Sequence, residues 1–197
     1  FHEKAKDRAS PIFERDGDLD RALAMYEAAV ELAPVDLVVL GSLINFHVEM
    51  RQWDHGVFAI ERFVSNPATT PSNRIAALLQ QAEIHAEGQM NSARAITVLR
   101  DVIKLDPEHG EAHYRLAQEY YLLGRLPEAA SSIDRLIAIA TAPGKALSPT
   151  ALARYYYYKG RIAEAAGEHR AAAPQYRRAI EYDPGYAPPA ASAMRPL

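Results

Sequence analysis

A small residue recurs along this chain at nearly constant spacing, each time near the start of an expected helix. The five residues are Ala22, Gly56, Ala95, Ala129 and Ala172, separated by 34, 39, 34 and 43 positions. The period is therefore 34, with insertions of five and nine residues. Such a period is typical of solenoids, in which each helical pair buries its apolar face against its neighbours. The spacing predicts a molecule built from stacked copies of one unit.

The clearest copy of this unit runs from Gly160 to Pro184. Its apolar residues recur with the period of an amphipathic helix, and a turn divides it into two helices. The same period, punctuated by glycine and proline, predicts helices in residues 18–32, 37–50, 54–65, 74–87, 92–105, 111–123, 127–140, 151–166 and 170–182. Near the beginning, Ser10 and Pro11 match an N-cap and a first-turn proline, so we expect a helix in residues 1–15 to be broken there.

Three segments depart from the regular plan. Residues 66–73 and 141–150 are rich in turn-forming residues, and they coincide with the two insertions. Pro174 falls inside an expected helix, where a proline costs about 3 kcal/mol because it lacks a backbone donor. We therefore expect a late helix start or a local distortion near Pro174.

Five landmarks of the clearest unit are Gly160, Ala172, Tyr176, Ala179 and Pro184. They resemble the tetratricopeptide repeat, which places small residues where two helices touch, then an aromatic residue, then a closing proline. Four further units echo the pattern, and the second unit is the most degenerate. The matching residues in the other three are Gly17, Ala22, Tyr26, Ala29 and Pro34; Ala95, Leu99, Val102 and Pro107; and Ala117, Tyr120, Gly124, Ala129, Ile133 and Leu136.

This resemblance implies an all-α fold, a right-handed superhelical solenoid of about five tetratricopeptide-like antiparallel helix pairs. It also implies a single domain over residues 1–197. The repeats are expected at approximately 1–36, 37–70, 71–109, 110–143 and 150–184, with the start of a further or capping helix in 185–197.

Composition and charge narrow the classes of function. The net charge of −3, from 22 basic and 25 acidic residues, disfavours a nucleic-acid surface. No apolar run approaches the roughly 20 residues of a membrane helix, so we expect no direct membrane insertion. The absence of cysteine leaves the compartment open, with the cytoplasm slightly favoured over the periplasm. Because the chain begins at Phe1, we expect a fragment or a mature form.

The sequence offers no support for an enzyme, a cofactor or a metal site. Phosphate-binding loops, nucleophile motifs and dinucleotide-binding glycine patterns do not occur. His109 and His113 have the i, i+4 spacing of zinc ligands, but no third ligand accompanies them, so we expect them to be solvent-exposed. His47, His55, His85 and His169 are expected to be packing or surface residues. Trp53, the single tryptophan, is expected to pack between two helices.

Four consecutive tyrosines, residues 155–158, are the strongest local anomaly. A helix spreads four neighbours over all its faces, so Tyr156 is expected to pack on the fourth unit while Tyr157 and Tyr158 face a concave groove. Tyrosine and arginine are enriched at binding hot spots, although these rings could equally serve packing between repeats. The resemblance places the following residues on the partner-binding groove: Asn45, Tyr114, Arg115, Gln118, Tyr121, Tyr157, Tyr158, Arg161 and Glu164.

These patterns favour a non-enzymatic scaffold or adaptor that holds a peptide, helix or loop of another protein in the groove. A clamp for chaperone tails is disfavoured, because only Asn45 occupies a comparable position and Gly41 stands where that subtype has lysine. One alternative is an assembly module of a larger bacterial envelope or secretion complex, bound through the convex face or the 141–150 insertion. Single-stranded RNA binding is a second alternative, which the net charge disfavours.

Overall fold

The computed structural model describes residues 19–145 and 147–185 of the 197-residue chain. Within these ranges all regular structure is helical. The helices are α2 (Leu19–Leu32), α3 (Leu37–Glu49), α4 (Trp53–Ser65), α5 (Pro71–Glu83), the π-helix η1 (Ile84–Gly88), α6 (Ser92–Leu105), α7 (Gly110–Leu122), α8 (Leu126–Ala140), α9 (Pro149–Ala165) and α10 (His169–Tyr182). The predicted break at Ser10 and Pro11 lies outside the described residues. So does nearly all of the predicted capping helix in 185–197.

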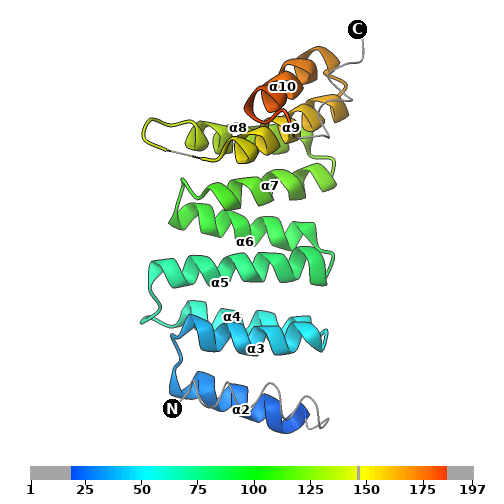
Figure 1. Ribbon diagram of the computed structural model, residues 1–197. Helices are drawn as coiled ribbons and strands as arrows, with labels where there is room; N and C mark the ends of the chain where they lie inside the picture. Colours follow the sequence, from blue (N-terminus) through cyan, green and yellow to red (C-terminus); the bar gives the residue numbers. More distant parts are fainter. Residues whose placement is uncertain (1–18, 146, 186–197) are drawn as a thin grey trace. The chain divides into compact units, whose positions relative to one another are not determined.

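The chain divides into two compact units, residues 1–101 (unit 1) and residues 102–197 (unit 2). Figure 1 shows the antiparallel pair α3 and α4 of unit 1 in light blue and cyan, and the pair α9 and α10 of unit 2 in yellow and orange. The single domain expected over the whole chain stays a prediction.

In unit 1, α2 packs on α3, α3 on α4, and α4 on both α5 and η1. Leu40 and Ile44 of α3 join Ile60 and Phe63 of α4 in a buried cluster that also includes Ala77 and Ile84. The expected small residues Ala22, Gly56 and Ala95 are buried. A Cβ added to Gly56 would lie 3.3 Å from Cδ1 of Ile84, so the helices approach closely at this residue.

In unit 2, α7 packs on α8, α8 on α9, and α9 on α10. The closest approach is between Gly160 of α9 and Tyr176 of α10, where an added Cβ would lie 2.6 Å from the tyrosine Cε1. Tyr176 is only 2% exposed, so its ring has little freedom to move away. Ala129 and Ala172, the remaining members of the periodic series, are buried as well.

Two helices start earlier than the sequence pattern predicts. The α5 helix begins at Pro71, and the Thr70 side chain caps it by accepting a hydrogen bond from the backbone N–H of Asn73 at 3.2 Å. The α9 helix begins at Pro149, and Ser148 caps it through the backbone N–H of Ala151 in the same way. The predicted starts at 74 and 151 are therefore wrong, because each loop ends in a capping residue followed by a first-turn proline.

Part of each insertion is helical rather than looped. The α9 helix has 17 residues, whereas α7 has 13, and α5 continues directly into the five-residue π-helix η1. The sequence pattern predicts an ordinary α-helix up to residue 87. This prediction is wrong for residues 84–87, which belong to the π-helix η1. The late start considered for the helix that contains Pro174 is wrong, because α10 begins at His169 and includes the proline. The local distortion expected near Pro174 stays a prediction.

Candidate functional site

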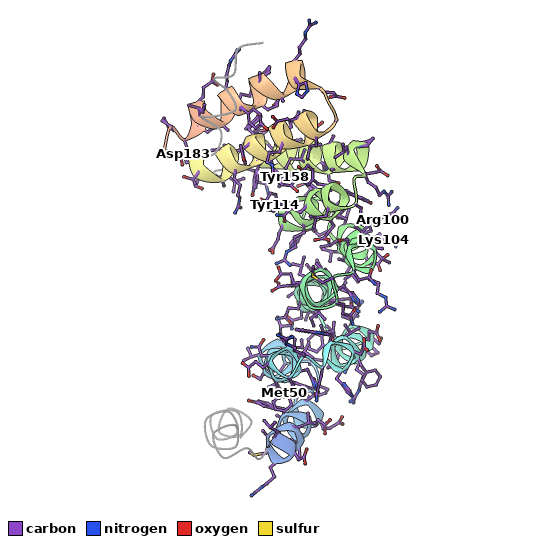
Figure 2. All side chains as sticks on the ribbon, turned by 90° about the vertical axis from the view of Figure 1, so that its right-hand side faces the viewer. Met50, Arg100, Lys104, Tyr114, Tyr158 and Asp183 are labelled. Atoms are coloured by element: carbon purple, nitrogen blue, oxygen red, sulfur yellow. The ribbon has the colours of Figure 1, made fainter. Side chains whose placement is uncertain are left out.

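Tyrosine and arginine side chains gather where α9 lies beside α7 in unit 2. We call this surface the Tyr–Arg face and define it by Tyr114 and Tyr121 of α7 and by Arg154, Tyr155, Tyr158 and Arg161 of α9. Figure 2 labels Tyr114 and Tyr158, which lie on these two neighbouring helices. The residues of α9 share a face because positions 154, 158 and 161 follow the i, i+4, i+7 spacing of a helix.

The rings of the face form a continuous chain of contacts. Tyr114 lies between Tyr155 and Tyr158, with centroid distances of 5.6 and 5.8 Å, and Tyr158 also contacts Tyr121 at 5.7 Å. Interplanar angles between 45° and 59° show that the rings are tilted against one another. Such contacts add about 0.5–1.5 kcal/mol each beyond simple burial, so the rings are held in place before any ligand binds.

Both arginines of the face lie over tyrosine rings. The guanidinium of Arg154 is 5.0 Å from the Tyr114 centroid, and that of Arg161 is 5.4 Å from the Tyr121 centroid. Arg161 also donates a hydrogen bond from Nη2 to the Tyr121 hydroxyl at 3.3 Å. Both side chains are exposed, and within the described part of the chain no ion pair joins either of them to an acidic residue. The face therefore presents two positioned cations to solvent.

The Tyr158 hydroxyl stays protonated at neutral pH. Burial raises the pKa of the Tyr158 hydroxyl above its ordinary value, and the adjacent Tyr114 adds to the rise. Burial alone lowers the pKa of Arg161, but the attraction and hydrogen bond of Tyr121 outweigh that effect, so the pKa is raised overall. The neutral Tyr158 ring therefore lies on the same helix face as the positively charged Arg161.

Of the residues expected on the groove, the structure brings Tyr114, Tyr121, Tyr158 and Arg161 together. Tyr157 instead lies against Tyr176 of α10, with centroids 5.6 Å apart. Two other predicted groove residues contact different side chains: Arg115 pairs with Glu111 at 2.9 Å, and Glu164 accepts a hydrogen bond from the Tyr176 hydroxyl at 2.7 Å. Gln118 is half-buried on α7 and has no ring contact on this face. Asn45 belongs to unit 1.

Tyr156 differs in part from its expectation. Its ring stacks on Tyr182 of α10 at 5.4 Å and 12°, and its hydroxyl accepts a hydrogen bond from Arg178 of the same helix. Ile137 of α8 packs against the same cluster, so contact with the fourth unit is only one side of its surroundings. Tyr156 is a core residue between α9 and α10.

Arg154 and Tyr155 are the members of the face that reasoning from the sequence misses. The signal is present, since Arg154 lies four residues before Tyr158 and seven before Arg161, which places all three on one stripe of a helix. Tyr155 is half-buried and turns its ring toward Tyr114.

The expectation that His109 and His113 are solvent-exposed is wrong. His113 is 8% exposed, and its Nε2 lies 3.0 Å from the carbonyl oxygen of Pro107. His109 is half-buried and caps α7 by accepting a hydrogen bond from the backbone N–H of Ala112. The fourth position of the helix points into the core, which explains the burial of His113. Of the other histidines, His47 and His85 are buried and His55 and His169 are exposed.

Two classes of site are not found within residues 19–145 and 147–185. No cluster of three or more histidine, aspartate or glutamate side chains there is arranged to hold a metal ion. None of the described helices combines the length and the apolar character needed to cross a membrane.

The described helices and their pairing define an all-α helical-repeat solenoid. Tetratricopeptide repeat family models match residues 9–36, 84–146 and 153–186, which span the first, third, fourth and fifth predicted repeats. The chain belongs to the tetratricopeptide repeat family, as the landmark residues predict. Members of this family typically act as interaction modules, so the protein has the fold of a protein-interaction scaffold.

Solved structures share this fold at low sequence identity. MamA from Desulfovibrio magneticus RS-1 is 14% identical with a TM-score of 0.65, over 94% of this chain and 97% of that chain. BtubC from P. vanneervenii is 17% identical with a TM-score of 0.67, over 89% and 78%. YrrB, described as a TPR protein with an unusual peptide-binding site, is 18% identical with a TM-score of 0.61, over 89% and 83%. No curated protein matches the sequence significantly.

Proposed function

We propose that this protein is a non-enzymatic scaffold that binds an acidic segment of another protein on the Tyr–Arg face. The observation that carries the proposal is the pair Arg154 and Arg161, each held over a tyrosine ring and neither paired with a carboxylate among the described residues. An arginine fixed in this way loses less entropy on binding a carboxylate than a mobile one. The likeness to YrrB supports a peptide as the form of the partner.

The spacing of the two arginines favours a particular backbone conformation in the partner. Seven residues of α-helix separate them by about 10.5 Å along the axis, on nearly the same face. A polyproline II segment presents every third side chain on one face, about 9.3 Å apart. Two carboxylates three positions apart would therefore reach Arg154 and Arg161 together. The two prolines between them would hold the segment in this extended conformation.

The test uses a peptide with the core Glu-Pro-Pro-Glu, capped at both ends so that it carries no terminal charge. Replacing both Arg154 and Arg161 by glutamine should weaken binding by tenfold or more, because two charge-assisted contacts are lost, each worth about 1.5 kcal/mol or more. Isothermal titration calorimetry measures the affinity. Circular dichroism checks that the helices are unchanged.

A matched control comes from α10. Arg170 and Arg177 are also seven residues apart and exposed, but no tyrosine contact to them is found in the described chain. Changing both to glutamine alters the net charge equally and should leave the affinity within about twofold, roughly 0.4 kcal/mol. Equal weakening by the two double variants would mean that overall charge, and not the Tyr–Arg face, binds the peptide.

Assembly into a larger complex is the second candidate, favoured by an apolar depression in unit 1. Phe58 of α4 is 60% exposed and lines a hollow of about 580 Å³ between α2 and α4, together with Ala24, Ala28 and Pro34. In that case the arginine variants would leave complex formation intact in cell extracts, and Phe58→Asp would abolish it. The reverse pattern would support the Tyr–Arg face.

A further inference from the structure

The exposed faces of α2 and α4 in unit 1 carry a large ring and small side chains next to each other. Phe58 of α4 is largely exposed, although it lines the hollow of about 580 Å³ between the two helices. On the other side of the hollow, α2 presents Ala24 and Ala28, which are both exposed and lie one helical turn apart. One patch therefore holds both an exposed aromatic ring and a shallow trough lined by methyl groups.

The floor of the hollow is held in place by the core. Leu43, Phe63 and His47 line it and are buried. Nδ1 of His47 lies 2.9 Å from Oε1 of Gln52, and the His47 ring stacks on that of His55 with centroids 5.4 Å apart. Because core packing and this hydrogen bond fix the floor, the hollow keeps its shape before anything binds, which lowers the entropic cost of binding.

Charges of both signs border the hollow. Arg62 of α4 pairs with Glu31 of α2 at 2.7 Å, and its side chain is still 58% exposed. Glu27, one turn before Glu31 on α2, lines the hollow and makes no ion pair within the described part of the chain. A guanidinium has five N–H donors, so Arg62 can bind a second carboxylate while it keeps Glu31. A partner that fits this surface therefore carries a carboxylate for Arg62 and a cation for Glu27.

We propose that the occupant of the hollow is a second copy of this chain, bound face to face about a two-fold axis. In such an interface both copies use the same patch, so every contact between two different residues occurs twice. Phe58 of each copy would lie on Ala24 and Ala28 of the other, and Arg62 of each copy would reach Glu27 of the other. The ring, the trough and the two charges that a partner needs are all present on the patch itself.

The size of the patch limits the strength of the dimer. The helices α2 and α4 have 14 and 13 residues. Each is therefore about 20 Å long and, with its side chains, about 10 Å wide, so the two together offer roughly 400 Å² per copy. A dimer would bury about 800 Å² in total, less than the roughly 1,200–2,000 Å² of stable complexes. We expect a reversible dimer with a dissociation constant of about 10–100 µM.

Dimerisation through the hollow goes beyond the proposed function of the Tyr–Arg face. All the residues involved belong to unit 1, and a second copy of the chain would give the hollow of the assembly candidate a definite occupant. Self-association of the purified chain and binding of the Glu-Pro-Pro-Glu peptide are measured separately, so either can fail without the other. Phe58→Asp should bind that peptide as the wild type does.

Sedimentation equilibrium of the purified full chain, from about 1 to about 500 µM, tests the proposal. We expect the average mass to rise with concentration from that of one chain toward that of two. Phe58→Asp should weaken dimerisation by at least about tenfold, because it places a charge in the apolar contact twice per dimer. Val38→Asp is the matched control, since Val38 of α3 is as exposed as Phe58 but lies outside the hollow, and it should leave the dimer unchanged.

Charge reversal tests the two-fold geometry directly. Glu27→Arg places two cations at each contact with Arg62, and Arg62→Glu places two carboxylates there, so each variant alone should dimerise at least about tenfold more weakly. An equal mixture of the two variants has an arginine opposite a carboxylate at both contacts of a mixed dimer. The mixture should therefore dimerise nearly as well as the wild type. Circular dichroism verifies that each variant is folded.

Three results would overturn the proposal. The first is the mass of a single chain at every concentration, which would leave the hollow to a different protein. The second is unchanged dimerisation of Phe58→Asp, which would place the interface elsewhere. The third is a mixture of the two folded charge-reversed variants that dimerises no better than either variant alone, because the two-fold contact between Arg62 and Glu27 would then not exist.

Discussion

Among the residues that the structure describes, two glycines lie directly beneath aromatic rings, one in each unit. A Cβ atom added to Gly160 of α9 would lie 2.6 Å from the nearest ring carbon of Tyr176 in α10. A Cβ atom added to Gly88 of η1 would lie 2.7 Å from the nearest ring carbon of Trp53 in α4. The surroundings of the two rings differ. Tyr176 is enclosed by the core of its helix pair, whereas Trp53 is half-buried and borders an open cleft that residues of α3, α5 and η1 also line.

The contact between Gly160 and Tyr176 contributes to the packing of the core, whereas the contact between Gly88 and Trp53 also shapes the surface of the cleft. The Gly160 contact joins the two helices of one repeat and belongs to the repeat pattern. The Gly88 contact joins α4 to the end of a neighbouring, lengthened helix, and it belongs to no repeat landmark. The first contact joins two landmark residues of the repeat, and the second joins residues outside the repeat pattern.

The largest expected effect is that of Gly160→Ala. The new methyl group meets an immobile ring, and overpacking of this kind costs about 1–3 kcal/mol, against at most about 1 kcal/mol gained in helix propensity. Urea unfolding should show a loss of stability of about 1–2 kcal/mol. Gly41→Ala in α3 is the control, because nothing lies within 4 Å of its added Cβ, and it should gain about 0.5–1 kcal/mol. A stabilised Gly160→Ala would show that Tyr176 is free to move.

Alkaline pH should weaken unit 2 before unit 1. Burial raises the pKa of Tyr158 and, together with a hydrogen bond to Glu164, that of Tyr176, above the ordinary value of 10.0. The folded chain therefore keeps protons that the unfolded chain loses, so this stability is fully present below about pH 10 and is lost as the pH rises above it. Ten of the eleven tyrosines lie in residues 102–197, the exception being Tyr26.

Unfolding followed at pH 8 and at about pH 10.5 measures this difference. Trp53 emission reports unit 1, and circular dichroism reports both units. Tyr176→Phe should lower stability at pH 8 by about 1 kcal/mol through the lost hydrogen bond, and should make the decline above pH 10 shallower. A decline of the same steepness in wild type and variant would exclude Tyr176 as its source.

The smallest effect is expected for Gly88→Ala. Trp53 can tilt into the cleft to accommodate the methyl group, so the loss of stability should be about 1 kcal/mol or less. The displaced indole should nevertheless shift its emission maximum, which the corresponding change at Gly160 should not do. A destabilisation as large as that of Gly160→Ala would mean that the two rings are equally confined.

The repeat architecture was predictable because its contacts recur with the chain's own period. Ala22, Gly56 and Ala129 are buried where the spacing places them, since a solenoid uses the same close approach in every unit. The clustering of Tyr114 with Tyr158 followed from the repeat register. The position of Arg154 on this face was also predictable, because residues 154, 158 and 161 follow the i, i+4, i+7 spacing of one helix face.

The cleft of unit 1 was not predictable from pattern alone. The π-turn at Ile84–Gly88 looks in the sequence like the end of an ordinary helix, and only the packing of Trp53 against Gly88 distinguishes it. The burial of His113 was missed for a related reason, because its hydrogen bond to Pro107 depends on the turn before α7. Both features arise from tertiary contacts that override local propensity.

We propose above all that the Tyr–Arg face binds two carboxylates of a partner at a fixed spacing. Calorimetric titration of the wild-type chain with two capped peptides of identical composition, one with the core Glu-Pro-Pro-Glu and one with Pro-Glu-Glu-Pro, tests it most directly. Only the first peptide presents its carboxylates about 9.3 Å apart on one face, so it should bind at least about fivefold more tightly. Equal affinities for the two peptides would contradict the account.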